Sequence, residues 1–124
     1  MATKIKILLV DDSSDYAECF IKFIQEELPD MVDSVIVVKN GLEAINLVNH
    51  NKFDLIFMDI NMPGMNGFDA TRYLNIHFPS ITVVALSFMS DLTSMERMIA
   101  AGARYYVVKE EFDADTLMRI IKDK

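Results

Sequence analysis

Five short apolar runs, separated by segments with helical periodicity, are the feature of this sequence that most constrains its fold. The runs cover residues 5–10, 35–38, 55–58, 81–86 and 105–108. They are rich in β-branched and aromatic residues and are mostly continuous rather than alternating, which is expected of strands that are covered on both faces. The sequence therefore predicts five buried strands.

The segments between these runs carry apolar residues at helical spacing. In the first segment the apolar residues share one face and Pro29 ends the run. The five stripes are Tyr16/Cys19/Phe20/Phe23/Ile24/Leu28, Leu42/Ile45/Val48, Phe68/Thr71/Leu74, Leu92/Met95/Ile99 and Leu117/Ile120/Ile121. Gly102 is a suitable left-handed cap for the fourth helix, and we expect Cys19 to be a packed, reduced thiol.

Strand and helix thus alternate five times over 124 residues. Right-handed crossovers then give a parallel sheet with helices on both faces, in one domain that spans residues 1–124. The formal charge of -7 argues against direct binding to nucleic acid. Neither a signal peptide pattern nor a run of membrane-spanning length is visible, so we expect a cytoplasmic protein that binds no membrane.

Polar residues that could act in catalysis or ligand binding follow four of the predicted strands. Asp11 and Asp12 follow the first, Asp59 the third, Ser87 the fourth and Lys109 the fifth. Taken singly, each has a structural explanation as a helix cap, a turn hydroxyl or a surface ammonium. Together they are expected at one edge, because ligands of open parallel sheets bind beyond the carboxyl ends of the strands.

If the first and third strands are neighbours, three carboxylates meet at this edge. Each like-charged pair about 5 Å apart costs on the order of 3 kcal/mol at an effective dielectric constant of about 20. Lys109 offers one positive charge, and an all-oxygen site suits Mg²⁺ better than Zn²⁺. Such a site meets the needs of phosphoryl transfer, with Asp59 as nucleophile, Mg²⁺ on Asp12 and Asp59, and Ser87 and Lys109 on phosphoryl oxygens.

These residues also carry a family resemblance. The motifs are Val10-Asp11-Asp12, Asn40-Gly41 with Glu43-Ala44, Asp59 with Met62, Pro63 and Gly67, then Ser87, and Gly102-Ala103 with Tyr106 and Lys109. In this combination the chain resembles, over its whole length, the receiver domain of two-component response regulators. The resemblance implies a flavodoxin-like fold with strand order 2-1-3-4-5.

The resemblance also implies a role for each residue of the site. Asp59 would be the phosphoacceptor, with Lys109 and Ser87 as catalytic partners. Mg²⁺ would be held by Asp11, Asp12, Asp59 and the backbone carbonyl of Asn61. Ser87 and Tyr106 would form a switch pair, and the phosphodonor would be a histidine kinase or a phosphotransfer protein.

The face expected to respond is formed by the fourth helix, the fifth strand and the fifth helix. It could bind a partner or form a homodimer. Its candidate residues are Met89, Met95, Met98, Tyr106 and Met118, although a methionine at helical spacing is more often buried in the core. Tyr105 is expected to pack near the sheet edge.

Three positions depart from the family pattern. Tyr105 stands where glycine is common, and the other two departures lie next to the site. Glu110 follows Lys109 where many members have proline, so the turn must be built differently. The lack of proline is more typical of receivers joined to helix-turn-helix output domains, which favours a larger transcriptional regulator with a C-terminal DNA-binding domain outside this chain.

Phe88 follows the switch hydroxyl where a small residue is usual. It either narrows the site, which would slow phosphorylation and hydrolysis, or turns outward into a partner surface.

Several other functions remain open at this point. A stand-alone receiver would act through protein–protein contacts alone, without external enzymatic turnover. An Asp-nucleophile phosphohydrolase usually has a second acid two residues after the nucleophile, where Asn61 stands here. A flavin carrier of the same fold needs a phosphate-binding loop after the first strand, where Asp11, Asp12 and Asp15 would repel phosphate. A receiver-like interaction module without phosphorylation is disfavoured by the intact acceptor set.

Overall fold

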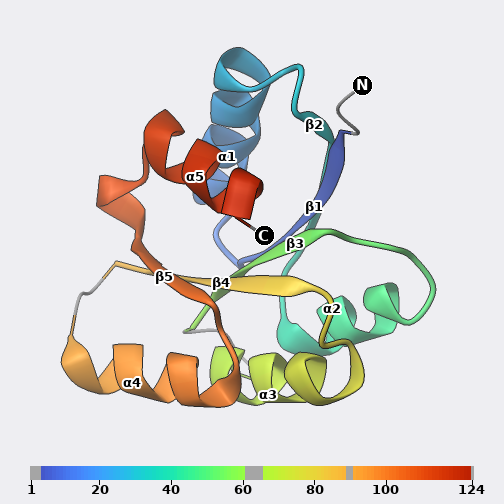
Figure 1. The fold of residues 1–124 in the computed structure, drawn as a ribbon, viewed down its shortest axis with the longest axis vertical. Helices are drawn as coiled ribbons and strands as arrows, with labels where there is room; N and C mark the ends of the chain where they lie inside the picture. The colour runs from blue at the N-terminus through green and yellow to red at the C-terminus, as the bar shows by residue number, and fades with distance from the viewer. Residues whose placement is uncertain (1–3, 61–65, 89–90, 124) are drawn as a thin grey trace.

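The computed structural model describes residues 4–60, 66–88 and 91–123 of the chain (Figure 1). Strands and helices alternate along it, as the apolar runs predict. The elements are β1 (Ile5–Val10), α1 (Ser14–Glu27), β2 (Val32–Val38), α2 (Gly41–Val48), β3 (Leu55–Asp59), α3 (Gly67–His77), β4 (Thr82–Ser87), α4 (Leu92–Ala101), β5 (Tyr105–Val108), the 3-10 turn η1 (Lys109–Glu111) and α5 (Ala114–Asp123).

The five strands form one parallel sheet in the order β2-β1-β3-β4-β5. This confirms the predicted α/β architecture and the strand order that the resemblance implied. The chain moves outward from β1 to the edge strand β2 and then returns past β1 to β3. Connections from β1 and β3 therefore leave the sheet in opposite directions, which opens a crevice beyond their carboxyl ends.

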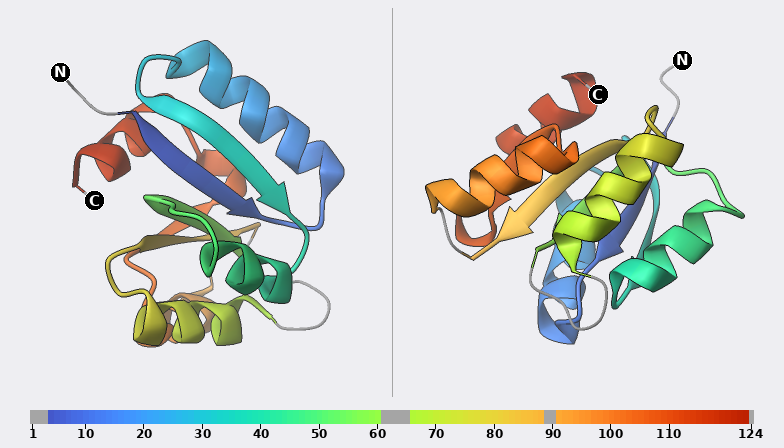
Figure 2. Two further views of the ribbon diagram at one scale, coloured as in Figure 1. Left: turned by 90° about the vertical axis from the view of Figure 1, so that its right-hand side faces the viewer. Right: turned by 90° about the horizontal axis from the view of Figure 1, so that it is seen from below.

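Helices cover both faces of the sheet (Figure 2). One core lies under α1 and α5 and is centred on Phe20, Phe57 and Leu117. The other lies under α2, α3 and α4. All residues of β3 and β4 are buried, which explains their continuous apolar sequences, whereas the edge strands β2 and β5 keep partly exposed positions. None of the helices built from the described residues is long and apolar enough to cross a membrane.

Helix ends follow the local chemistry of the sequence. The side chains of Ser13, Asn40, Asn66 and Asp91 each accept a hydrogen bond from a backbone N–H three residues further on, as N-cap residues do. The left-handed cap predicted at Gly102 is confirmed, with φ at 118°.

Three predictions about helix faces are wrong, and the first concerns Leu42 of α2, which is 63% exposed while Ala44, Ile45 and Val48 are buried. Cys19 is exposed, because α1 packs through Ala17, Phe20 and Ile24 and one residue along a helix turns a side chain by about 100°. On α4 the predicted stripe is also turned outward: Leu92 and Ile99 are 68% and 51% exposed. The buried positions are Met98 and Ala101, whose flexible and small side chains let α4 approach the sheet closely.

Candidate functional site

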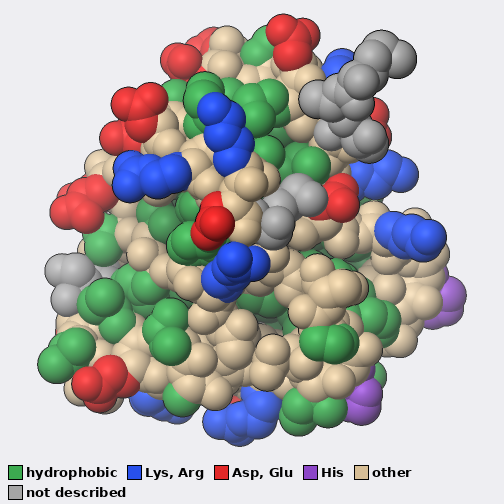
Figure 3. All heavy atoms as spheres, in the orientation of Figure 1, with side chains coloured by type: hydrophobic (Ala, Val, Ile, Leu, Met, Phe, Trp, Pro, Cys, Tyr) green, Lys and Arg blue, Asp and Glu red, His purple; other side chains and the backbone are tan. Residues whose placement is uncertain are grey.

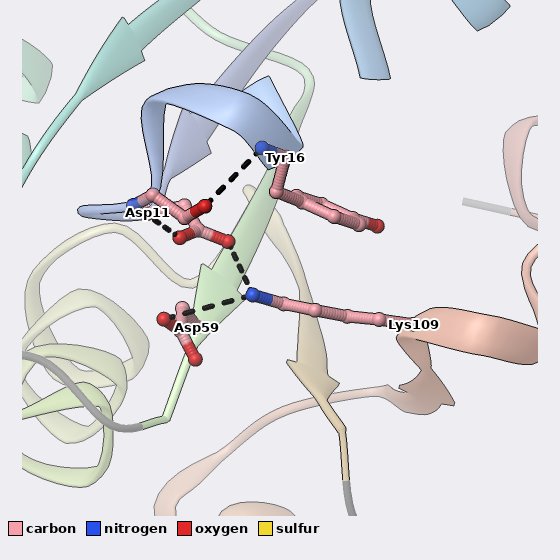
Figure 4. Close-up of polar contacts among 5 residues, drawn as sticks. Asp11, Tyr16, Asp59 and Lys109 are labelled. Carbon is pink, nitrogen blue, oxygen red and sulfur yellow. Dashed lines mark hydrogen bonds and ion pairs between the residues drawn. The ribbon is translucent and has the colours of Figure 1, made fainter. Parts of the chain in front are cut away.

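The site residues reach one edge of the sheet because of strand alternation and register. Leu9 and Phe57 point into the core under α1 and α5, so Asp11 and Asp59, two residues further along each strand direction, turn to the same side. Val10 pairs with Met58, which places the two aspartates next to one another across neighbouring strands. Lys109 enters from the end of β5, and Figure 4 shows its side chain extended toward both carboxylates.

Lys109 and Asp11 form a buried ion pair. The Nζ atom of Lys109 lies 2.6 Å from Oδ2 of Asp11 and 3.8 Å from Oδ2 of Asp59. The side chains of Lys109 and Asp11 are 2% and 0% exposed. The other carboxylate oxygen of Asp11 accepts a hydrogen bond from the backbone N–H of Ser13 at 2.9 Å. Both oxygens of Asp11 are therefore engaged, and Lys109 bridges the ends of β1 and β3.

Three carboxylates gather around this ammonium group. Asp11, Asp12 and Asp59 each offer an oxygen, and these oxygens lie within 4.8 Å of one another. At an effective dielectric constant of about 20, each carboxylate pair at this separation repels by roughly 3 kcal/mol. One ammonium group neutralises only one of the three charges, so the cluster keeps excess negative charge.

A hollow of about 320 Å³ lies beside the cluster. It is lined by Asp11, Asp12, Ser13, Asp59, Ser87, Phe88 and Lys109. The carboxylate groups facing it provide oxygen ligands with excess negative charge, which is the donor chemistry that Mg²⁺ prefers. The residues present therefore fit a magnesium ion. Asn61, whose carbonyl was predicted as a further ligand, lies outside the described residues.

Gly67 fixes the backbone on the far side of Asp59. A Cβ atom at this position would lie 2.5 Å from the carbonyl oxygen of Asp59 and 2.7 Å from Cα of Ile60. The backbone N–H of Gly67 also donates to the carbonyl of Ile60 at 3.4 Å. The first turn of α3 thus abuts the end of β3 at a distance that only glycine permits.

Ser87 and Tyr106 lie on one side of the sheet, opposite the side of Lys109. Ser87 is the last residue of β4, is 1% exposed and lines the hollow. Tyr106 pairs with Ala85, two residues before Ser87, so alternation turns Tyr106 and Ser87 toward the same helical layer. Tyr106 is half-buried against the core under α2, α3 and α4. It also borders a cavity of about 630 Å³ between β5 and α5.

Of the methionines predicted for the responsive face, Met98 is buried and Met95 and Met118 are half-buried, while Met89 lies outside the described residues. Tyr105 is half-buried on the edge strand β5, as expected. Its hydroxyl donates a hydrogen bond to Asp123 of α5.

Two aromatic rings near Lys109 complete the surroundings of the site. The Nζ atom of Lys109 lies 4.4 Å from the ring centroid of Tyr16 and 4.6 Å from that of Phe88. Phe88 is 62% exposed and also lines the hollow, and both effects considered for it stay predictions. Burial, and then the carboxylates of Asp11 and Asp59, raise the pKa of the Tyr16 phenol.

Sequence reasoning missed the contact between Tyr16 and Lys109. Tyr16 belongs to the apolar stripe of the first predicted helix, and this spacing indicated only a core residue. The available signal was its place in the first turn after Asp11 and Asp12, because a first-turn residue of that helix stays close to the carboxyl edge of the sheet.

Comparisons with known proteins agree with this geometry. The family model described as "Response regulator receiver domain" matches residues 7–122. The transcriptional regulatory protein DegU of Brevibacillus brevis is 35% identical over 96% of this chain and 49% of its own length. The chemotaxis protein CheY of Listeria monocytogenes is 31% identical over 95% of this chain and 96% of its own length.

A solved structure with the same fold is the receiver domain of a sensor histidine kinase from Pseudomonas aeruginosa, which has a magnesium ion coordinated in its active site cleft. It is 23% identical, covers 98% of this chain and 97% of that chain, and has a TM-score of 0.82. The chain spans about half the length of the first two curated relatives that it matches. The sequence match, the strand order and the acidic edge together show that the chain belongs to the response regulator receiver domain family, whose members are signalling domains.

Proposed function

We propose that this chain accepts a phosphoryl group on Asp59 and passes the change in charge to a surface that contacts partners. The observation that carries the proposal is the meeting of three carboxylates and one buried ammonium group around a solvent-accessible hollow. Among these carboxylates, Asp59 lies at the end of a central strand and lines the hollow. It is therefore the group best placed for attack on an incoming phosphorus atom.

The proposed reaction is an in-line displacement. A carboxylate oxygen of Asp59 forms a bond to phosphorus while the bond between phosphorus and the donor breaks. With a phosphohistidine donor, the imidazole nitrogen leaves with the electron pair of the P–N bond. Hydrolysis reverses the state of the domain: water attacks phosphorus, the acyl phosphate bond breaks, and the Asp59 carboxylate and inorganic phosphate are formed.

The residues around Asp59 have distinct proposed roles. Lys109 is already 3.8 Å from the Asp59 carboxylate, so a small shift would pair it with a phosphoryl oxygen. The hydroxyl of Ser87 lines the same hollow and would donate a hydrogen bond to another oxygen. Both contacts stabilise negative charge that develops during transfer.

Magnesium would be held by Asp11, Asp12 and Asp59, with the carbonyl of Asn61 as a further proposed ligand. When bound, Mg²⁺ would neutralise charge on the carboxylates and on the phosphoryl oxygens. The magnesium ion in the related kinase receiver domain supports this assignment. Asp11 already uses both oxygens in hydrogen bonds, so we expect it to act through a water molecule.

Phosphorylation would place roughly two negative charges and three strong acceptors at Asp59. Movement of Ser87 toward these acceptors would free space on the side of the sheet that it shares with Tyr106. The responding surface would be the face formed by α4, β5 and α5. Hydrophobic side chains gather over α4 in Figure 3. Leu92 and Ile99 of α4 are 68% and 51% exposed.

The proposed donor is a histidine kinase or a phosphotransfer protein. We propose that residues 1–124 form one receiver domain and that it works within a larger transcriptional regulator, as suggested by relatives such as DegU, of which this chain matches about half. The match to CheY along nearly its whole length supports the alternative of a stand-alone receiver that acts through protein contacts. The cytoplasmic location stays a prediction.

The deciding experiment measures the mass of the intact protein after incubation with Mg²⁺ and acetyl phosphate. The wild-type chain should gain one phosphoryl group, and chelation of Mg²⁺ should prevent the gain. Asp59→Asn should gain none, because an amide is a poor nucleophile. Asp12→Asn should need more Mg²⁺ for the same rate.

Asp54→Asn is the matched control. Asp54 precedes the same strand, β3, and its carboxylate accepts a hydrogen bond from the backbone N–H of Lys6 at 2.8 Å, at the opposite edge of the sheet. This variant should be phosphorylated like the wild type. A gain retained by Asp59→Asn, or no gain in the wild type, would contradict the proposal, and repeated turnover of a simple phosphomonoester would favour a phosphohydrolase instead.

A further inference from the structure

The ammonium group of Lys109 lies close to two aromatic rings that come from different parts of the chain. Tyr16 belongs to the first turn of α1, and Phe88 directly follows β4. Their ring centroids lie 4.4 Å and 4.6 Å from Nζ, inside the range of about 6 Å in which a ring face attracts a cation. Because the Lys109 side chain is only 2% exposed, little water screens this attraction.

Lys109 needs such support because its own backbone cannot fix the position of Nζ. A lysine ammonium is a point charge on a flexible four-carbon stem with three rotatable donors. The electron-rich faces of aromatic rings attract the charge but are much weaker acceptors than carboxylates. Rings can therefore hold the ammonium group while its N–H bonds remain directed at Asp11, Asp59 and an arriving phosphoryl oxygen.

The two rings differ in their relation to the hollow. Phe88 is largely exposed and lines it, so loss of this ring would loosen Lys109 and also widen the entrance for a donor. Tyr16 is half-buried, with its ring 6.2 Å from that of Phe20. Tyr16 is not among the described residues that line the hollow. Figure 4 shows its side chain running beside that of Lys109, away from Asp59.

From this geometry we infer that Tyr16 is a positioning residue for phosphoryl transfer. Together with the ring of Phe88, its ring holds the Lys109 ammonium group at the carboxylates, so that the side chain is already in the rotamer in which it can pair with a phosphoryl oxygen. This role rests on the proposed function of Asp59. It assigns Tyr16 an effect on the rate of transfer and none on access of the donor.

The kinetic test compares Tyr16→Leu with Tyr16→Phe in the full chain, with acetyl phosphate as donor at saturating Mg²⁺. Tyr16→Leu should lower the maximal phosphorylation rate on the order of threefold to tenfold, the loss expected for one desolvated contact between a cation and a ring. The donor concentration at half-maximal rate should stay unchanged. Tyr16→Phe keeps the ring face and should restore the rate, and Tyr73→Leu on α3 is a matched control that should behave as wild type.

A spectroscopic test reports on the rings without any phosphorylation. In the wild type, ring currents should shift the Cε proton resonances of Lys109 upfield of those of other lysines. Both Tyr16→Leu and Phe88→Leu should move these resonances toward ordinary values. Phe88 is 62% exposed, so its replacement leaves the fold intact and gives a reading even if Tyr16→Leu does not fold.

The outcomes separate this inference from the proposed function. A phosphorylated wild type with the same maximal rate in folded Tyr16→Leu would overturn the role of Tyr16 alone. Lys109 resonances that lie at ordinary values in the wild type would equally overturn it. A wild type that acquires no phosphoryl group would overturn the proposed function and this role with it.

Discussion

The carboxyl edge of the sheet and the outer face of α4 distribute their side chains in opposite ways. At the edge, Asp11 and Lys109 are charged and almost completely buried. On α4, Leu92 and Ile99 are apolar and more than half exposed. Acidic side chains gather over α1 and the η1–α5 segment, and hydrophobic ones over α4, on the face seen in Figure 3.

Each arrangement departs from the usual sorting of charged residues outside and apolar residues inside. Buried charges need partners within the protein, whereas exposed apolar side chains gain from partners outside it. Stability alone would favour neither arrangement. The two regions are joined by β4 and β5, which carry Ser87 and Tyr106. A change of charge at the carboxyl edge could therefore affect the outer face through these two neighbouring strands.

The largest expected effect comes from removing the counter-charge of the buried edge. Lys109→Met keeps an unbranched side chain that is only one atom shorter, but it removes the ammonium group beside Asp11 and Asp59. Loss of one partner of a buried ion pair costs about 3 to 5 kcal/mol, which urea unfolding without metal should measure. Mg²⁺ should recover part of the loss, because a cation at the carboxylates replaces the missing charge.

Lys122→Met is the control for this comparison, since Lys122 is exposed on α5. Its effect should stay within about 0.5 kcal/mol. A loss for Lys109→Met no larger than that of the control would show that the edge does not depend on its ammonium group.

A pair of neighbouring residues sharpens the description of α4. Met98 is 0% exposed and Ile99 is 51% exposed. Met98→Ala should lower the free energy of unfolding by about 2 to 5 kcal/mol, because it leaves a cavity in the core. Ile99→Ala should change it by less than about 0.5 kcal/mol. Equal losses in thermal or urea unfolding would mean that the exposed face of α4 is wrongly assigned.

Tyr106→Ala tests whether the two regions communicate. We expect phosphorylation of Asp59 to proceed normally, because Tyr106 does not line the hollow beside it. The change in dimerisation or partner binding on phosphorylation should weaken, by up to the 5- to 150-fold that a coupling of about 1 to 3 kcal/mol represents. Sedimentation with and without acetyl phosphate measures the change in dimerisation. A change as large as that of the wild type would show that Tyr106 has no role in the switch.

The smallest effect concerns surface aspartates that cap helices far from the buried cluster. The backbone N–H of Ser94 lowers the pKa of Asp91, and that of Thr116 lowers the pKa of Asp113. Both groups keep their charge to lower pH in the folded chain than in the unfolded chain. Their contribution to stability is therefore complete above the ordinary value of 3.8 and is lost as pH falls through the folded pKa.

Asp113→Asn separates this contribution from the cap itself, since the amide oxygen still accepts the hydrogen bond from Thr116. The variant should be slightly less stable than the wild type at neutral pH. The difference should disappear in strong acid, as followed by urea unfolding across the acid range. A difference that is constant with pH would exclude titration of Asp113 as its source.

The sequence predicts most of the fold for a clear physical reason. Strands buried on both faces need continuous apolar runs, and β3 and β4 have them over their full buried length. The polar residues that follow such runs mark the carboxyl edge, so Asp11, Asp59, Ser87 and Lys109 could be placed together before any coordinates. Strand order could not be read from periodicity. The alternation of strands and helices predicts right-handed crossovers, but it does not say which strands lie next to one another in the sheet.

Helix faces and contacts between helices and the site were less predictable. The α4 stripe through Leu92 and Ile99 has the right spacing for a core face, but spacing cannot tell a face that meets the sheet from one that meets a partner. Cys19 illustrates the same limit on α1. The contact of Tyr16 with Lys109 joins residues 93 positions apart in sequence, and only the tertiary arrangement of α1 and η1 creates it.

The close approach at Gly67 makes the acceptor sensitive to changes that carry no charge at all. With only a hydrogen atom between the helix and the strand end, even alanine would push against the peptide unit of Asp59. Such a replacement would tilt the carboxylate relative to Lys109 while leaving every ionisable group in place. The orientation of the Asp59 carboxylate is thus as much a part of this site as its charges. The methyl group of an alanine at position 67 would change that orientation without changing any charge.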